Sequence, residues 1–319
     1  MSAPAQDIST PIVASSDDGE AARVWSSGGS IFTAQKLLPG LHIVATPIGN
    51  LGDITLRGLA TLAAADMILA EDTRMARRLT DHYGIKTPTR RFDAHASAAQ
   101  TAIIMAELTA GAAYALISDA GTPLVSDPGS TLVVQLVQAG ITVHPVPGAS
   151  ALLAALVVAG MPADRFFFEG FLPPKTGDRR RRLRALAGVP GALVFYEAPH
   201  RILETLVDLQ AILGNRHAAA ARELTKLYET VIRGPLRDIT AHFEKEAPRG
   251  EFVLVISPPA EAVEENGADL DEQLTALMQQ MSVKDAAAVI AGEQGLPKRE
   301  VYARALRIAS KTQLRDKAE

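Results

Sequence analysis

Short apolar runs alternate with longer amphipathic segments in the first half of the chain. The runs that we interpret as buried strands are 41–46, 67–70, 113–117 and 142–146. The segments between them with helical character are 56–65, 73–83, 97–110 and 129–139. Strands that are apolar along most of their length and alternate with helices are typical of a parallel sheet covered on both faces. We therefore predict an α/β domain over residues 39–160.

The pattern changes after Gly160-Met161-Pro162. The strand candidates beyond this point are 166–168, 193–196, 219–221 and 252–256. Helices are predicted at about 178–187 and 200–213, and Gly234-Pro235 indicates a turn. Because helices separate only some of these strands, we expect a second α/β domain over residues 161–258 with a more mixed sheet.

The two ends of the chain lack this alternation. Residues 1–38 are rich in Ser, Ala, Gly and Asp and show no period, which predicts a disordered leader. A polar linker is expected over 259–269. The tail, 270–319, contains three helical segments, at 270–281, 283–292 and 297–310. The last two flank a glycine-containing turn, so the tail has either a helix-turn-helix shape or that of a plain capping bundle.

Composition narrows the class of protein. With 47% hydrophobic residues and a net charge of −4 over 319 residues, the chain resembles a folded protein rather than a disordered one. It has no cysteine, which excludes disulfides, cysteine-ligated metals and thiol catalysis, and no His-Glu-x-x-His motif, so we expect no metal site. Neither a membrane-length apolar stretch nor a signal peptide is evident, and we expect a cytoplasmic protein with no membrane contact.

Basic side chains are concentrated in three places. One is the run Arg179-Arg180-Arg181-Arg182, and another comprises Arg74, Arg77, Arg78, Arg90 and Arg91. The third is the end of the tail, where residues 298–317 include seven basic and two acidic side chains. Each cluster alone fits a solvated helix face, but three of them in a chain of low net charge favour a polyanionic partner.

Three loops of the first domain carry unusual residues directly after predicted strands. They are 46–53, with Gly49 and Gly52, the polar loop 118–129, and 146–151. Open α/β sheets bind ligands at the carboxyl ends of their strands, so we interpret 118–129 in particular as a ligand loop. None of the loops has a Gly-x-Gly-x-x-Gly or Gly-Lys-Ser/Thr pattern, and Ser150 lacks the second glycine of a hydrolase elbow. A nicotinamide enzyme, a P-loop enzyme and a serine hydrolase are therefore poorly supported.

Charged and aromatic residues also follow the strands of the second domain, in segments 169–175, 196–201 and 221–226. Taken singly, His200 or Glu223 is more typical of a cap or a surface group than of a catalyst. Three such segments in one domain favour a ligand cleft between the two domains.

These loop segments together resemble one protein family. Val44–Asp53, Ser118–Pro123 and Pro147–Ser150 resemble the tetrapyrrole-methylase superfamily. Phe168–Pro173, Tyr196–Arg201 and Arg222–Lys226 are similar to the branch of it that methylates a cytidine 2′-hydroxyl of small-subunit (16S) ribosomal RNA at the decoding centre. The resemblance covers about 39–258, the tail also fits it, and residues 1–38 lie outside it.

The resemblance implies two α/β domains with S-adenosylmethionine held in the cleft between them, a small helical tail and a homodimer. The cofactor positions that it implies are Pro47, Ser118, Ala120, Gly121, Thr122, Val125, Ser150, Ala151 and Ala221. Members that act in corrin and heme synthesis usually carry a second glycine and an aspartate where this chain has Ala120 and Thr122, a departure that fits the RNA branch. The implied partner is 16S ribosomal RNA or the small ribosomal subunit.

Methylation of a ribose hydroxyl benefits from a general base, because the hydroxyl is a weak nucleophile. The candidates are carboxylates on the cleft-facing loops, which the sequence does not rank: Asp119, Glu197 and Glu223. The candidate contacts to RNA phosphates are Arg179, Arg180, Arg181, Arg182, Arg201, Arg222, Lys298, Arg299 and Arg304. Two alternatives stay open: a methyltransferase of the same fold that acts on a tetrapyrrole, and a non-enzymatic nucleic-acid-binding regulator whose tail is the reader.

Overall fold

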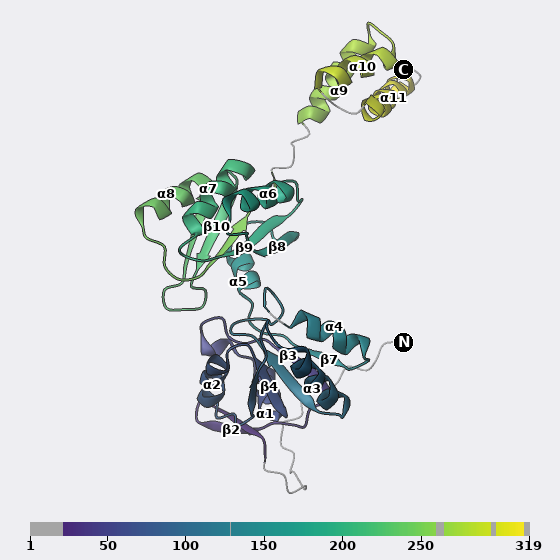
Figure 1. The fold of residues 1–319 in the computed structure, drawn as a ribbon. Coiled ribbons are helices and arrows are strands. Elements are labelled where there is room, and N and C mark those ends of the chain that lie inside the picture. Colours follow the sequence, from purple (N-terminus) through teal and green to yellow (C-terminus); the bar gives the residue numbers. More distant parts are fainter. Residues whose placement is uncertain (1–21, 128, 260–264, 295–297, 316–319) are drawn as a thin grey trace. The chain divides into compact units, whose positions relative to one another are not determined.

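The computed structural model describes residues 22–127, 129–259, 265–294 and 298–315. The described residues up to Ser257 form one compact unit, and those from Pro258 onward form a second. The first unit contains two lobes, each built on its own five-stranded sheet (Figure 1). These lobes and the helical second unit confirm the predicted fold class.

The first lobe contains a fully parallel sheet, as predicted. Its strands are β3 (Gly40–Val44), β4 (Met67–Ala70), β5 (Thr89–Arg91), β6 (Ala113–Ile117) and β7 (Val143–Val146). They lie in the order β5-β4-β6-β3-β7, and every pairing is parallel. The sequence does not predict β5, which has only three residues, all polar.

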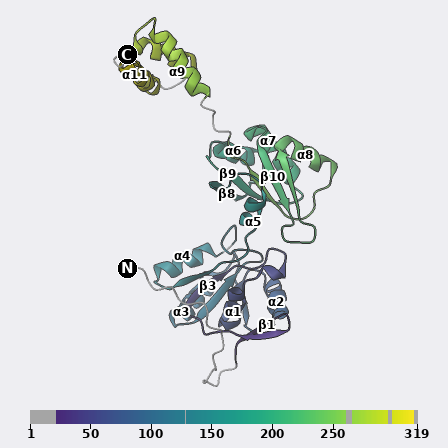
Figure 2. The ribbon, with the colours of Figure 1, turned by 180° about the vertical axis from the view of Figure 1, so that it is seen from behind.

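Each face of this sheet has its own apolar core, because neighbouring residues of a strand point to opposite faces. Helices α1 (Leu56–Ala64) and α2 (Thr73–His82) pack on the face that carries Ile68 and Ala115. Helices α3 (Ala98–Thr109) and α4 (Ser130–Gln138) pack on the opposite face, with Leu69 and Leu116 (Figure 2). Burial on both faces explains why β4 and β6 are apolar along their whole length.

The second lobe contains a mixed sheet. Its strands are β8 (Phe166–Phe171), β9 (Ala192–Glu197), β10 (His217–Arg222), β11 (Thr230–Pro235) and β12 (Phe252–Ile256). Their order is β11-β10-β12-β9-β8, and only β8 and β9 run parallel. Helices α6 (Thr176–Leu186), α7 (Ile202–Leu213) and α8 (Leu236–Lys245) cover one face. Helix α5 (Ala151–Val158), which follows the loop after β7, covers the other and ties the lobes together.

The predicted disordered leader is wrong for its second half. Strands β1 (Val24–Ser27) and β2 (Ser30–Thr33) form a hairpin, and Trp25 is buried in the core of the first lobe together with residues of α1. Ser26 N donates a hydrogen bond of 2.8 Å to Tyr83 O, which fastens the hairpin to the end of α2. Residues 1–21 of the predicted leader lie outside the described residues.

The predicted turn at Gly234-Pro235 is also wrong. Both residues belong to β11, where Gly234 pairs with Ala218. Helix α8, which the sequence does not predict, begins at the next residue, so the chain passes from strand to helix without a loop.

The second unit is a small helical domain. Helices α9 (Glu265–Met278), α10 (Val283–Gln294) and α11 (Lys298–Arg315) pack around a core that includes Leu274, Ile290 and Val301. Three helices agree with the prediction for the tail. However, α9 begins at Glu265, so the expected linker 259–269 is too long, and residues 295–297 of the expected turn lie outside the described residues.

Candidate functional site

Hydrogen bonds connect three loops at the carboxyl edge of the first sheet. After β3, Thr46 N donates to Gly121 O at 2.8 Å, and Gly121 N donates back to Thr46 O at 3.0 Å. Thr122 Oγ1 donates to Ala149 O, in the loop after β7, at 3.1 Å. The loops that follow β3, β6 and β7 therefore form one continuous edge, at the place where open α/β sheets bind ligands.

The loop after β6 has a backbone conformation that few side chains adopt. Gly121 has a φ of +78°, and a Cβ at this position would lie 3.2 Å from Ile48 Cγ2. Leu124 and Ser126 have φ values of 73° and 68°, which non-glycine residues rarely show. Backbone strain of this kind is concentrated at functional sites, where the surrounding structure holds it in place. The conformation is thus consistent with the ligand loop expected from the sequence.

A cavity of about 490 Å³ lies against this edge. Its walls come from both lobes, since the loops of the first lobe face the ends of β8, β9, β10 and β12. Many lining side chains are small or apolar, among them Ile48, Val125 and Leu224, and a smaller number are charged. A cavity of this size and character suits a ligand as large as a nucleotide cofactor.

Most of the predicted cofactor positions line this cavity. Those that do so are Ala120, Gly121, Thr122, Val125, Ser150, Ala151 and Ala221. Pro47 and Ser118 are not among the lining residues. Ser118 is buried, and its Oγ donates to Ala120 O at 3.3 Å, so it supports the loop instead of facing the cavity.

Glu197, a predicted candidate for the general base, lines the cavity but has both carboxylate oxygens engaged. Oε1 accepts a hydrogen bond from Ala198 N at 2.9 Å, and Oε2 accepts one from Thr205 Oγ1 at 2.6 Å. Arg201 Nε lies 3.6 Å from Oε1. The residue is buried, so these contacts fix the turn that follows β9.

Glu223 and Asp119, the other two candidates, also line the cavity. Glu223 Oε1 pairs with Lys226 Nζ at 3.0 Å and accepts from Glu251 N at 3.1 Å. Burial opposes ionisation of Glu223, but its hydrogen bonds and the charge of Lys226 outweigh burial and lower its pKa. Asp119 Oδ1 accepts from Asp72 N at 3.1 Å, which ties the start of α2 to the loop after β6. Of the two, Glu223 is the one that is held in an ion pair, with Lys226.

Two of the other carboxylates that line the same cavity have raised pKa values and are not singled out by the sequence: Glu71 and Asp127. Burial, together with Asp119 and Asp127, raises the pKa of Glu71. Burial also raises the pKa of Asp127, against the effect of a hydrogen bond from Ser118 and with that of Asp119. Carboxylates with raised pKa values in a cavity are typical of acid–base sites. The position of Glu71, directly after β4, is the sequence signal that could have revealed it.

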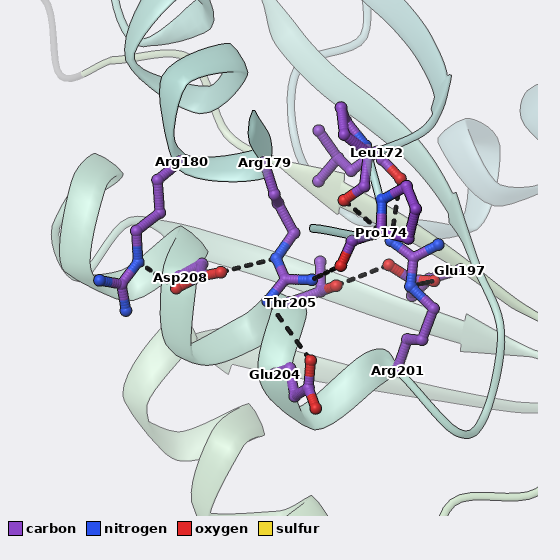
Figure 3. Close-up of polar contacts among 10 residues, drawn as sticks. Leu172, Pro174, Arg179, Arg180, Glu197, Arg201, Glu204, Thr205 and Asp208 are labelled. Atoms are coloured by element: carbon purple, nitrogen blue, oxygen red, sulfur yellow. Dashed lines mark hydrogen bonds and ion pairs between the residues drawn. The ribbon is translucent and has the colours of Figure 1, made fainter. Parts of the chain in front are cut away.

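Arg179 is buried, so the prediction that it contacts RNA is wrong. Its side chain and that of Asp208 are each 2% exposed, and Arg179 Nε donates to Asp208 Oδ2 at 2.6 Å (Figure 3). Nη1 of the same guanidinium donates to Pro174 O at 3.2 Å. Arg179 therefore joins α6 to α7 and to the turn after β8.

The other three arginines of the run keep part of their surface in solvent. Arg180 Nε donates to Asp208 Oδ1 at 2.6 Å, and Arg182 Nε donates to Glu169 Oε1 at 2.6 Å. Arg181 is the most exposed of the three, at 78%, and pairs with a residue of its own helix. Only these three arginines of the run can reach a partner.

Arg201 is engaged within the second lobe as well. Its Nη2 donates to Leu172 O at 2.8 Å and to Pro173 O at 3.3 Å (Figure 3). With Glu197 beside it, the guanidinium is part of the structure that holds the turn after β8, which argues against a phosphate contact.

The remaining predicted RNA contacts are spread over both units. Arg222 lies half-buried at the end of β10. In the second unit, Lys298 and Arg299 are exposed at the start of α11, whereas Arg304 Nε donates to Asp271 Oδ1 at 2.6 Å. Among the described residues, no group of acidic or histidine side chains could hold a metal ion, and no helix is long and apolar enough to span a membrane.

Residues 40–240 match the family model of the Tetrapyrrole (Corrin/Porphyrin) Methylases. The two lobes and the cavity between them are therefore those of a methylase of the two-domain α/β type. The fold is similar to that of a diphthine synthase (TM-score 0.55, 14% identical, 68% of this chain and 89% of that chain) and of the methyltransferase CobJ (TM-score 0.53, 21% identical, 70% and 95%). These similarities to solved structures show the fold alone.

The sequence comparisons identify the family more narrowly. Proteins named Ribosomal RNA small subunit methyltransferase I are 46% identical over 283 residues in Mesorhizobium japonicum and 44% identical over 277 residues in Pseudomonas aeruginosa. The matches cover 88% and 85% of this chain, and 96% and 98% of the relatives. Residues 264–309 match the RsmI C-terminal HTH domain, which favours the helix-turn-helix interpretation of the tail. The chain belongs to the ribosomal RNA small subunit methyltransferase I family.

Proposed function

We propose that this protein transfers a methyl group from S-adenosylmethionine to the 2′-hydroxyl of a cytidine in 16S ribosomal RNA, in the decoding centre of the small ribosomal subunit. Its relatives are named for methylation of small-subunit ribosomal RNA. The observation that carries the proposal is the cavity, which brings a strained glycine loop of one lobe together with carboxylates and aromatic side chains of the other.

The residues around the cavity fit S-adenosylmethionine. Ala120, Gly121, Ala151 and Ala221 offer apolar contact and have no bulky side chain, which leaves room for an adenosine. The carboxylate of Glu71 and its acidic neighbours supply negative charge for a ligand that carries a sulfonium and an ammonium group. When bound, the cofactor supplies an electrophilic methyl group. The protein then has to align the acceptor oxygen with that group, and such alignment supplies roughly 7–11 kcal/mol of the rate enhancement in favourable cases.

On the acceptor side, a residue of the chain has to take up the proton of the ribose hydroxyl. We assign this role to Asp127, which lines the cavity and whose pKa is raised by burial, because a base works best when its pKa approaches the working pH. Glu197 and Glu223 are engaged in hydrogen bonds and an ion pair that hold the loops, so we assign them a positioning role. Asp119, which lies near enough to raise the pKa of Asp127, supports that base electrostatically.

RNA binding would draw on the exposed basic side chains. Arg180, Arg181 and Arg182 on α6 are at least partly exposed, and Lys298 and Arg299 are exposed at the start of α11. Contacts of this kind to phosphates set the affinity and its salt dependence but do not read the base sequence.

We also propose that the protein is a cytoplasmic homodimer. Helix α5 exposes 52% of Leu153 and 81% of Val157, which lie four residues apart on one face of the helix. Apolar side chains exposed side by side are typical of a protein–protein contact, and a ribosomal substrate requires a cytoplasmic enzyme. Light scattering that found only a monomer would contradict the dimer.

The test of the reaction uses radiolabelled S-adenosylmethionine and small ribosomal subunits from cells that lack this protein. After digestion of the RNA, we expect the label on 2′-O-methylcytidine. Label on another nucleoside would correct the acceptor. Absence of label on RNA, in a protein that still binds the cofactor, would refute the proposal.

A further inference from the structure

Phe171, the last residue of β8, is an aromatic side chain that lines the cavity and yet is 57% exposed. Its ring lies 5.7 Å from that of Tyr196 on the neighbouring strand, at an interplanar angle of 64°. Tyr196 in turn contacts the ring of Phe168 at 4.9 Å and 67°. The aromatic wall formed by Phe168, Tyr196 and Phe171 thus ends in a ring with an open surface at the cavity.

An irregularity in β8 determines where Phe171 lies. The pairing with β9 shifts register between Phe168 and Gly170, and shifts of this kind redirect the side chains beyond them. Gly170 has a φ of +75°, and a Cβ there would lie 2.6 Å from Ser126 Oγ in the loop of the first lobe. A side chain at this position would therefore be strained, which indicates that the local geometry of β8 is specific.

Two arginines fix the turn that follows Phe171. Arg201 donates to the carbonyl oxygens of Leu172 and Pro173, and Arg179 donates to that of Pro174 (Figure 3). The two prolines have no N–H of their own, so this turn offers mainly acceptors to its surroundings. Two guanidiniums satisfy three consecutive carbonyl groups and anchor the chain directly behind Phe171.

The two arginines are themselves held in place. Arg179 is paired with buried Asp208, and Arg201 lies beside Glu197, which accepts from Thr205 Oγ1 (Figure 3). Buried charges that are paired and hydrogen-bonded at several points are rigid, because any movement would leave a charge without its partner. An exposed ring on a support of this rigidity is better explained by ligand contact than by a mobile surface position.

We propose that Phe171 is the surface on which the nucleobase of the acceptor nucleotide stacks. This inference rests on the proposed function: if a ribose in RNA is methylated in this cavity, its base has to leave the RNA stack and find a new partner at the cavity wall. Bases splayed out of single-stranded RNA stack on aromatic side chains, and such contacts tolerate any base because every base has a π-face. Phe171 offers that surface, and Tyr196 supports it from the neighbouring strand.

The experiment compares Phe171→Ala with Phe171→Tyr, and with Phe166→Ala as a matched control. Phe166 starts the same strand and is 44% exposed, but it does not line the cavity. Methylation of unmodified small subunits is measured at saturating S-adenosylmethionine, and cofactor affinity is measured by calorimetry. Retained cofactor binding also shows that each variant is folded.

We expect Phe171→Ala to raise the KM for small subunits roughly 5- to 150-fold, the range for loss of one stacked base, with cofactor affinity unchanged. Phe171→Tyr should keep most of the wild-type KM, and Phe166→Ala should match the wild type. An unchanged KM in Phe171→Ala, equal losses of subunit and cofactor binding, or a change in oligomeric state on light scattering would each overturn the proposal. Failure of the wild type to label RNA would instead refute the proposed function.

Discussion

Removal of the Asp208 carboxylate should destabilise the second lobe severely. The side chains of Asp208 and Arg179 are each 2% exposed, and Asp208 Oδ2 lies 2.6 Å from Arg179 Nε. In Asp208→Ala the guanidinium of Arg179 would stay buried, with only Pro174 O at 3.2 Å and Glu204 Oε2 at 3.5 Å near it. A buried charge that loses its main partner is much more costly than an exposed ion pair that is broken.

The expected magnitude follows from this burial. Breaking a buried ion pair by removing one partner costs about 3–5 kcal/mol. The second contact of Asp208, with half-exposed Arg180, adds up to about 1 kcal/mol. The total loss is therefore about 3–6 kcal/mol. At about 2–4 °C per kcal/mol for a unit of this size, the melting temperature should fall by about 6–24 °C.

Urea denaturation followed by circular dichroism measures the free energy of unfolding directly. The matched control is Asp178→Ala. Asp178 Oδ1 also lies 2.6 Å from an arginine nitrogen, Arg181 Nη2, but the Asp178 side chain is 42% exposed. Its loss should therefore lower the free energy of unfolding by at most about 1 kcal/mol. The double variant Arg179→Met/Asp208→Leu should recover most of the lost stability, because an apolar pair replaces both charges.

Two results would refute this reasoning. If Asp208→Ala were no less stable than Asp178→Ala, the pair could not be buried as described. If the double variant were as unstable as Asp208→Ala, the loss would come from packing and not from the unpaired charge.

Three further outcomes are expected. Gly121→Ala should weaken S-adenosylmethionine binding about tenfold or more in calorimetry, because its φ of +78° disfavours a side chain, whereas Gly188→Ala, where a Cβ meets open space, should bind normally; equal affinities would exclude the loop from the site. The methylation rate should fall as the pH drops through the raised pKa of Asp127, because the protonated carboxyl cannot accept a proton, and Asp127→Asn should lose most of the rate; a flat pH profile would remove this residue from the proton step. Joint replacement of Lys298 and Arg299 by alanine should lower the slope of log affinity against log salt by about 1 per lost phosphate contact in filter binding, and an unaltered slope would contradict a role for the tail.

The parallel sheet of the first lobe is predictable because its strands are buried on both faces. β4 and β6 are apolar throughout, so a short apolar run is a sufficient signal. The β1–β2 hairpin gives no such signal. Its buried tryptophan, Trp25, is followed directly by the polar and small residues 26–30, and its burial depends on α1, which lies about 30 residues further along the chain.

The error at Arg179 has a local cause. A run of arginines suggests a uniform basic surface, but α6 packs on the sheet, and one side of every packed helix faces the core. Arg179, Leu183 and Leu186 lie at i, i+4 and i+7 and are all buried. The spacing shows which arginine faces inward, but the partner that makes its burial possible, Asp208, is 29 residues away.

The sequence could not rank the carboxylates as candidates for the general base, because their partners also come from other segments of the chain. The loops that carry them are recognisable because they follow strands, and this places Asp119, Glu197 and Glu223 at the cavity. What separates a structural carboxylate from an available one is its set of partners. Thr205, which engages Glu197, and Glu251, which engages Glu223, belong to other segments of the chain and meet these residues only after folding.

The two walls of the cavity, one from each lobe, differ in how well they would tolerate substitutions. On the first lobe the wall includes a loop whose geometry depends on φ values such as that of Gly121, together with the carboxylates Glu71 and Asp127, so most substitutions there would disturb the loop or the proposed reaction. On the second lobe the wall consists of side chains at strand ends, such as Phe171 and Tyr196, on a support that other residues hold. A diphthine synthase and the methyltransferase CobJ share the fold, and a shared fold does not fix the substrate. We therefore expect the second-lobe wall to determine which acceptor is methylated, because its side chains can be exchanged without altering the loops that would hold the methyl donor.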